Sequence, residues 1–295
     1  MAAHNVAEIQ DEIGILEARL RDARKRLENV QLTDTQGAVD RDSATTNNAA
    51  ASSPNIAPGL GSHTHFLLLL SDSQLPLGSF AFSSGLESYL AHTPPRTASF
   101  SSSFLPSSIS SMASTTLPFV LAAHRSPQEL AELDDQLDAA IVCTVGRRAS
   151  VAQGRALLGI WERSFRGTVT GDGQVLKDFS TLLRESQGQD VPLVSAHLAP
   201  LFGVICALVG MSLRQTAYVF MLSHVKALVS AAVRASMFGP YQAQKVLASA
   251  QVQRLIDVVI DREWNTAVED AGQATPMMDL WIGRHEVLYS RIFNS

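Results

Sequence analysis

The stretch Leu198-Ala-Pro-Leu-Phe-Gly-Val-Ile-Cys-Ala-Leu-Val209, followed by Gly210-Met-Ser212-Leu-Arg-Gln215, decides the fold class of this chain. Its apolar part carries no charge, but it is interrupted by proline and glycine and is shorter than the roughly 20 residues of a membrane-spanning helix. It predicts a helix buried in a protein core, with Gly210 just past its C-terminal end. Ser212 and Gln215 have the spacing of a capping box, which predicts a second helix that lasts to about Met237.

Helical patterns continue on both sides of this stretch. Ser126-Pro127-Gln128-Glu129 has capping-box spacing with proline at the first helical position. Ser84-Gly-Leu-Glu87 has the same spacing and predicts a helix that stops before Pro94. Tyr241–Ile260 is amphipathic. No segment keeps the period of two that is typical of strands, so we expect an all-α fold with one multi-helix domain over residues 63–295.

Two segments differ in composition from this domain. Residues 7–29 carry apolar residues at alternating spacings of four and three, which predicts a helix with one apolar seam that either docks or frays, or pairs with a second copy. Residues 31–62 are poor in aliphatic residues and predict a flexible linker, so residues 1–62 form an N-terminal extension. Residues 93–126 are rich in serine and predict a loop inserted into the domain. The seam consists of Ile9, Ile13, Leu16, Leu20, Ala23 and Leu27.

The charge balance and the N-terminal residues limit the partners and the compartment. The chain has 295 residues, a formal net charge of −5 and a pI near 5.9, which argues against binding to nucleic acid. Its two cysteines, Cys143 and Cys206, form no C-x-x-C pair. Acidic residues such as Glu8 and Glu12 interrupt any signal-peptide core. We therefore expect a cytoplasmic protein without a membrane partner.

The sequence lacks the common motifs of catalysis and of metal binding. It has no G-x-x-x-x-G-K-[ST] loop for nucleotide phosphates and no G-x-S-x-G turn for a nucleophilic serine. Of eight histidines, His63 and His65 alone are close together, in a segment expected to be flexible, and they are expected to be solvent-exposed linker residues. His197 and His224 are expected to be structural. We predict no catalytic residue, no metal ligand and no cofactor.

Three further features admit either a structural or a partner-binding interpretation. Lys226 lies in an otherwise uncharged apolar run, so it must pair or reach solvent. Arg155 similarly interrupts an apolar helical pattern. The terminus Arg284-His-Glu-Val-Leu-Tyr-Ser-Arg-Ile-Phe-Asn-Ser295 has the arginine and aromatic content of an interface anchor, although packing on its own domain is comparably compatible with its composition.

One long block resembles a known family. The stretch Leu67-Leu-Leu-Leu-Ser-Asp-Ser-Gln-Leu-Pro-Leu-Gly-Ser-Phe-Ala-Phe-Ser-Ser-Gly-Leu-Glu87 is similar to the N-terminal signature of the urease accessory protein F (UreF) family. Agreement continues in order at residues 147–158, at 197–203 with 210–234, and at 284–295, so the resemblance spans about 65–295 and indicates a eukaryotic, fungal-type member. Within the signature, a tight connection between two helices is expected at Asp72, Pro76, Gly78, Ser79, Ser84, Gly85 and Glu87.

The resemblance implies a function as well as a fold. UreF proteins are all-α, dimerise and act as nickel-insertion chaperones without enzymatic activity. They bridge the accessory protein UreD or UreH to the GTPase UreG and couple nucleotide turnover to nickel delivery into apo-urease. The resemblance assigns the C-terminal tail to the contact with UreD or UreH. The resulting set of candidate interface residues is Arg284, His285, Glu286, Tyr289, Arg291 and Phe293, together with Arg155 and Lys226.

Some parts of the chain fall outside this resemblance. Residues 1–62 and about 93–126 lie outside the shared pattern, and Gly239-Pro240-Tyr241 departs from the turn expected there. Two other classes of protein remain open from the residues alone. One is a coiled-coil scaffold built on residues 7–29, and the other is a helical hydrolase of unrecognised type.

Overall fold

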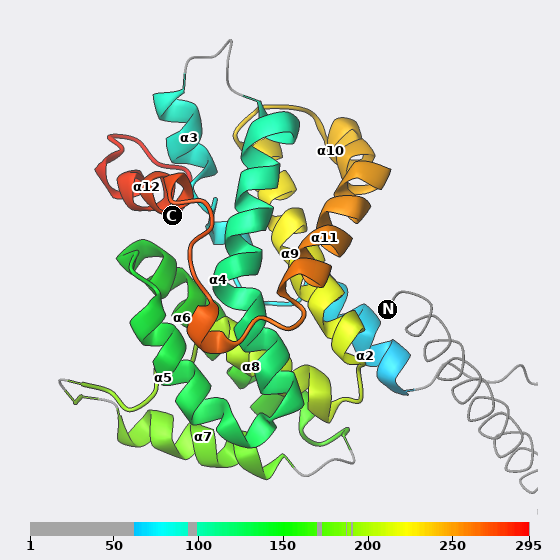
Figure 1. The fold of residues 1–295 in the computed structure, drawn as a ribbon, viewed down its shortest axis with the longest axis vertical. Helices are drawn as coiled ribbons and strands as arrows, with labels where there is room; N and C mark the ends of the chain where they lie inside the picture. Colours follow the sequence, from blue (N-terminus) through cyan, green and yellow to red (C-terminus); the bar gives the residue numbers. More distant parts are fainter. Residues whose placement is uncertain (1–61, 94–98, 170–172, 187, 190, 295) are drawn as a thin grey trace, which may run out of the picture. The chain divides into compact units, whose positions relative to one another are not determined.

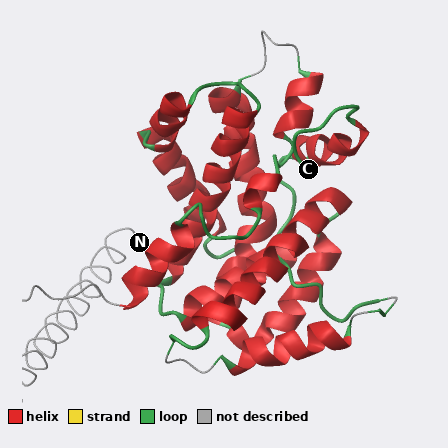
Figure 2. Ribbon diagram, turned by 180° about the vertical axis from the view of Figure 1, so that it is seen from behind, coloured by secondary structure: helices red, strands yellow, loops and turns green. Residues whose placement is uncertain are grey.

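The computed structural model describes residues 62–93, 99–169, 173–186, 188–189 and 191–294. The secondary structure of these residues consists of helices (Figures 1 and 2). No strand occurs in these ranges, and the all-α prediction is confirmed. The predicted helix at 7–29 and the linker up to residue 61 lie outside the described residues.

The elements follow one another with short connections. The first group consists of α2 (Ser62–Ser71), η1 (Ser79–Ala81), α3 (Leu86–His92), η2 (Phe100–Phe104) and α4 (Leu105–Arg125). The second consists of η3 (Pro127–Glu129), α5 (Leu130–Ala140), α6 (Thr144–Ile160), η4 (Trp161–Phe165) and α7 (Gln174–Glu185). The third consists of α8 (Leu198–Leu208), α9 (Leu213–Arg234), α10 (Pro240–Leu247), α11 (Ala250–Glu263), η5 (Val268–Asp270), α12 (Met277–Arg284) and η6 (His285–Val287).

Helix α4 occupies the centre of the fold and packs against α8, α9 and α11 (Figure 1). This helix is the greater part of the serine-rich segment, so the prediction of an inserted loop at 93–126 is wrong for residues 100–125. The serine and threonine hydroxyls donate to carbonyls of their own helix, as Thr115 does to Ser111 at 2.8 Å and Thr116 to Met112 at 2.6 Å. Because these polar groups bond locally, the helix can be buried despite its composition.

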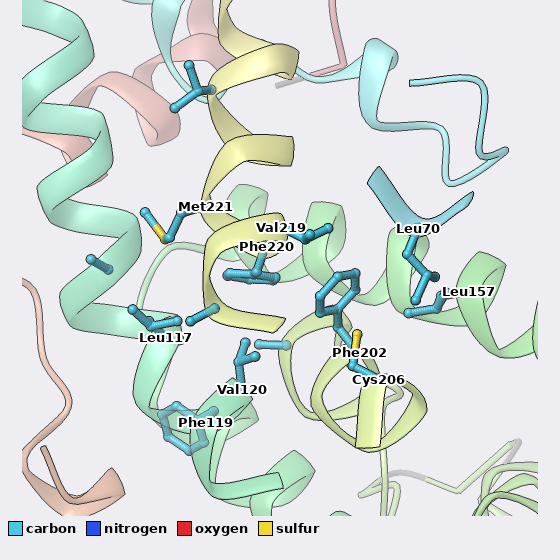
Figure 3. Packing of buried hydrophobic residues seen from close by; sticks show 14 of the residues in the cluster. Leu70, Leu117, Phe119, Val120, Leu157, Phe202, Cys206, Val219, Phe220 and Met221 are labelled. Carbon is cyan, nitrogen blue, oxygen red and sulfur yellow. The ribbon is translucent and has the colours of Figure 1, made fainter. Parts of the chain in front are cut away.

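The core forms where α4, α8 and α9 meet. Figure 3 shows Val120 of α4, Phe202 of α8 and Phe220 of α9 directed into the same region, and the rings of Phe202 and Phe220 lie 5.5 Å apart. Helix α8 is buried almost throughout, as its apolar sequence predicts. Gly203 faces the α4 backbone so closely that an added Cβ would lie 2.3 Å from the carbonyl oxygen of Val120. The absence of a side chain there sets the distance between the two helices.

The predicted helix boundaries were partly right. The capping box of α9 is confirmed, since the Ser212 hydroxyl accepts from the Gln215 amide and Gln215 reaches back to Ser212. Ser126 makes no such bond, and its segment begins as the short helix η3. Tyr241–Ile260 is not one helix, because α10 ends at Leu247 and Ser249 caps α11.

Helix α9 is the one helix among the described residues that is long and apolar enough to cross a bilayer. Its most apolar window is 61% buried within the fold, where it packs against α4, α10 and α2. Its apolar character is thus accounted for by its place in the core.

The close contact at Gly203 predicts that alanine lowers stability at this position but not at a glycine with open space around it. Gly203→Ala should lower the free energy of unfolding by about 1–3 kcal/mol, because the α4 backbone must move to admit the methyl group. Gly159→Ala in α6 is the matched control: its Cβ would meet nothing nearer than an Arg163 side-chain atom at 3.9 Å. It should raise stability by about 0.5–1 kcal/mol. Urea unfolding of both variants provides the measurement, and a Gly203→Ala protein as stable as the wild type would contradict the assigned contact.

Candidate functional site

The connection between α2 and α3 forms one side of the candidate site. Asp72 accepts a hydrogen bond from the Gln74 amide at 2.9 Å and starts a turn that continues through Pro76. Gly78 and Gly85 have φ angles of 73° and 85°, the left-handed region that favours glycine. Ser79 donates to the side chain of Gln153 on α6 at 2.8 Å. The turn is therefore set by its own backbone and held against α6.

Glu87 does not cap α3, so the predicted capping box at Ser84 and Glu87 is wrong. The helix begins after Gly85 without a side-chain cap, and Ser84 itself has a φ of 49°. The Glu87 carboxylate points to the C-terminal segment instead. It accepts from the amides of Ile292 at 2.6 Å and Phe293 at 3.2 Å, and from Nε2 of the fully buried His285 at 2.8 Å.

The C-terminal segment packs on its own domain. Phe293 is 4% exposed, and the guanidinium of Arg234 lies 4.3 Å from the centre of its ring. The Asn294 amide donates to the carbonyl of Ala81 at 2.8 Å. Because its backbone donors are bonded to Glu87 and Ala81, the tail is ordered without a partner. His285 and Phe293, two of the candidate interface residues, therefore lie in the interior of the domain.

Other tail residues remain on the surface. Tyr289 is fully exposed, and Arg284 and Arg291 are exposed as well. Glu286 forms an ion pair with Arg148 of α6, and the hydrogen bond from Arg148 lowers the pKa of Glu286. The apolar side chains of Val287 and Ile292 are exposed beside them. Together, α12, η6 and residues 288–294 present aromatic, aliphatic and arginine side chains on one segment, which we call the tail surface.

Arg155 and Lys226 form their hydrogen bonds with other parts of the fold than the tail surface. Arg155 donates through Nε to the carbonyl of Ser195 at 3.2 Å and is otherwise exposed on α6. Lys226 donates to the carbonyl of Ser71 at the end of α2. The geometry of Lys226 therefore agrees with the interpretation that its ammonium group is paired within the fold.

A second carboxylate that accepts from backbone amides, this one fully buried, was missed from the sequence. Asp134 of α5 accepts from the backbone amides of Ser195, Ala196 and His197 at 2.6, 3.0 and 2.6 Å. Burial raises the pKa of Asp134, and the amide donors act against this rise. His197 completes the cluster through Asp138 at 2.9 Å. The signal was present, because Asp134 falls on the apolar face of its helix.

The described residues contain no group of three His, Cys, Asp or Glu side chains that could hold a metal ion. His63 and His65 are exposed, as expected, but they lie on helix α2, so their assignment to a flexible linker segment is wrong. His224 is an interior residue, as expected: its Nε2 bonds with the Ser108 hydroxyl at 2.9 Å. Burial lowers the pKa of His224 to about 4.

Comparison with known proteins decides the family. The sequence model of the UreF family matches residues 99–251. A protein of Schizosaccharomyces pombe described as an uncharacterized urease accessory protein UreF-like is 38% identical over 234 residues, which cover 79% of this chain and 97% of that protein. The chain belongs to the UreF family. Urease accessory protein F of rice (Oryza sativa) is 33% identical over 76% of this chain and 82% of its own length, and urease accessory protein 6 of Cryptococcus neoformans is 27% identical over 78% and 96%.

Membership of the UreF family extends to the serine-rich segment. The family match begins at residue 99, immediately before η2 and α4. The expectation that residues up to 126 lie outside the shared pattern is therefore wrong from residue 99 onward. The fungal and plant relatives confirm that the chain is a eukaryotic-type member.

The contacts of Glu87 predict a local effect on the tail of this UreF chain. Glu87→Ala should speed amide exchange of residues 285–294 by about tenfold or more, because two amides and His285 lose their acceptor. Hydrogen exchange followed by mass spectrometry measures this. Glu286→Ala is the control on the same segment, and it should change exchange little because exposed ion pairs contribute little. Unchanged protection in Glu87→Ala would contradict the role of this carboxylate.

His224 predicts a defined dependence of stability on pH. Its pKa falls from 6.5 to about 4 on folding, so between these values the unfolded chain binds a proton that the folded chain does not. Stability must then fall as the pH drops through this window. Between pH 7 and pH 5 the wild type should lose about 1–2 kcal/mol more than His224→Gln in urea unfolding. His63→Gln, at an exposed site, should behave as the wild type, and equal losses in all three proteins would refute the assignment.

Proposed function

We propose that this chain is a urease accessory protein: a cytoplasmic, non-catalytic adaptor that joins a UreD/UreH-type protein to the GTPase UreG. In this role it couples GTP turnover to nickel delivery into apo-urease and acts as a homodimer. The observation that carries the proposal is its membership of the UreF family over nearly the whole length of the S. pombe relative. The rice relative bears the name urease accessory protein F.

The tail surface supports an adaptor function. Arginine and tyrosine dominate the binding energy of many protein interfaces, and Arg291 and Tyr289 are both exposed there. Glu87 accepts hydrogen bonds from the backbone of this segment, and Arg234 packs over the ring of Phe293. A surface that is ordered before binding loses less conformational entropy on association. We assign this face to the UreD/UreH-type partner.

In the adaptor proposal, other proteins of the complex carry out GTP hydrolysis and bind nickel. The sequence has no phosphate-binding loop, and three potential metal ligands do not converge within the described residues. UreG would supply the GTPase activity, and nickel would be cargo of the assembled complex. The purified chain should therefore neither hydrolyse GTP nor hold nickel tightly.

Urease activation in cells that lack this chain tests the function directly. The full chain and a variant without residues 1–62 should both restore urease activity and co-purify with the UreD/UreH-type protein and UreG. Loss of activation on deletion of residues 1–62 would favour a coiled-coil scaffold. Turnover by the purified chain alone would favour a hydrolase.

Single substitutions on the tail surface test the assigned face. Arg291→Ala and Tyr289→Ala should each weaken binding to the UreD/UreH-type protein by about 30-fold, the effect of losing roughly 2 kcal/mol at a hot spot. Arg254→Ala on α11 and Tyr241→Ala on α10 remove exposed residues of the same types and should leave affinity unchanged. Isothermal titration calorimetry gives the dissociation constants. Equal affinities in all four variants would remove the tail surface from the interface.

A further inference from the structure

A cavity of about 250 Å³ lies among α4, α6, α9 and α12 and is closed further by the α5–α6 connection and residues 271–273. Most of its lining is apolar, including Met112, Ile141, Phe220 and Ile282. Of the lining residues, Met278, Asp279 and Ile282 belong to α12 and so to the tail surface, and the others lie outside it. Apolar pockets with a few converging polar groups are the usual form of small-molecule sites.

Most polar side chains in the lining are already bonded within the fold. Ser150 bonds with His197, Gln153 accepts from Ser79, and Gln273 donates to Asp279. His224 is 91% buried, since its exposed fraction is 9%, and it is bonded to Ser108: its Nε2 bonds with the Ser108 hydroxyl at 2.9 Å, and the backbone of Ser108 is a further hydrogen-bond partner.

Ser111 adds a second hydrogen-bonding group beside His224. It lies one turn along α4 from Ser108, the residue that holds Nε2 of His224, and it lines the same cavity. Its carbonyl accepts from Thr115, whereas its hydroxyl makes no hydrogen bond within the described part of the chain. A hydroxyl both donates and accepts, so it complements either tautomer of the neutral imidazole.

The charges around the cavity limit what it can hold. Among the described residues, Asp279 is the one formally charged member of the lining, and its carboxylate already accepts from Gln273 at 3.0 Å. Because burial lowers the pKa of His224 to about 4, its imidazole is neutral near pH 7. No lysine or arginine of the described ranges lines the cavity, so an anion would enter without a counter-charge.

We infer that this cavity binds a small, uncharged and mainly apolar molecule whose hydrogen-bonding group reaches the hydroxyl of Ser111 beside the neutral imidazole of His224. The apolar walls exclude water from the body of the molecule, and the hydroxyl of Ser111 fixes its orientation. The inference is independent of the adaptor function.

Cys143 provides a reporter at the site. It lines the cavity and is partly exposed, whereas Cys206 is fully buried and burial raises the pKa of its thiol. Alkylation by iodoacetamide should therefore occur at Cys143 in the native full-length chain. Indole serves as the probe, because it is apolar, uncharged and carries one N–H donor. At ten times its dissociation constant it should slow alkylation by about tenfold.

The charge of the probe and the filling of the cavity each test whether indole binds inside it. Indole-3-acetate and tryptamine carry the same ring with a negative or a positive charge, and both should protect Cys143 far less than indole. Ala149→Phe fills the cavity from α6 and should abolish protection, whereas Ala152→Phe, on the exposed side of the same helix, should retain it. The charge comparison uses the wild type alone and so does not depend on the folding of a variant.

Three results would overturn the inference. Alkylation that indole does not slow at any concentration up to its solubility would mean that the cavity admits only water. Equal protection by all three indoles would mean that charge does not select the occupant. Protection that persists in a folded Ala149→Phe protein would place the probe outside the cavity.

Discussion

The close approach of α8 to α4 is the constraint on which the other helices depend. Gly203 lets the α8 backbone reach the carbonyl of Val120, and α9 and α11 then pack on the remaining faces of α4. A central helix made largely of serine, threonine and alanine suits this arrangement, because small side chains allow several neighbours to come near at once. The hydroxyls of Ser114, Thr115 and Thr116 donate to carbonyls of their own helix, which lowers the cost of their burial.

Two carboxylates, that of the buried Asp134 and that of the partly buried Glu87, hold distant segments against this framework. Asp134 binds the backbone amides that lead into α8, about 60 residues further along the chain, and Glu87 binds those of the tail, about 200 residues away. In both cases one side chain satisfies several backbone donors that lie outside regular helix. Each carboxylate therefore orders a segment that would otherwise lack partners for its amides.

In the tail, the ordered backbone fixes the positions of exposed side chains that an adaptor can use for binding. His285 and Phe293 are interior residues, and they hold the exposed side chains of Arg284, Tyr289 and Arg291 on a defined backbone. Truncating an interior residue here would reduce binding indirectly, through the position of its neighbours. Stability and affinity must therefore be measured together for any tail variant.

Local patterns in the sequence determined the helical class, the buried helix at Leu198–Leu208, the capping box at Ser212 and the interior position of His224, because each depends on residues within a few turns of one another. The long UreF-like block determined the family. The central place of α4 and the partners of Glu87 and Asp134 were decided only by the tertiary structure. A serine-rich segment is indistinguishable from a loop until neighbouring helices bury it. A glutamate three residues after a serine resembles a capping box until a distant segment supplies better donors.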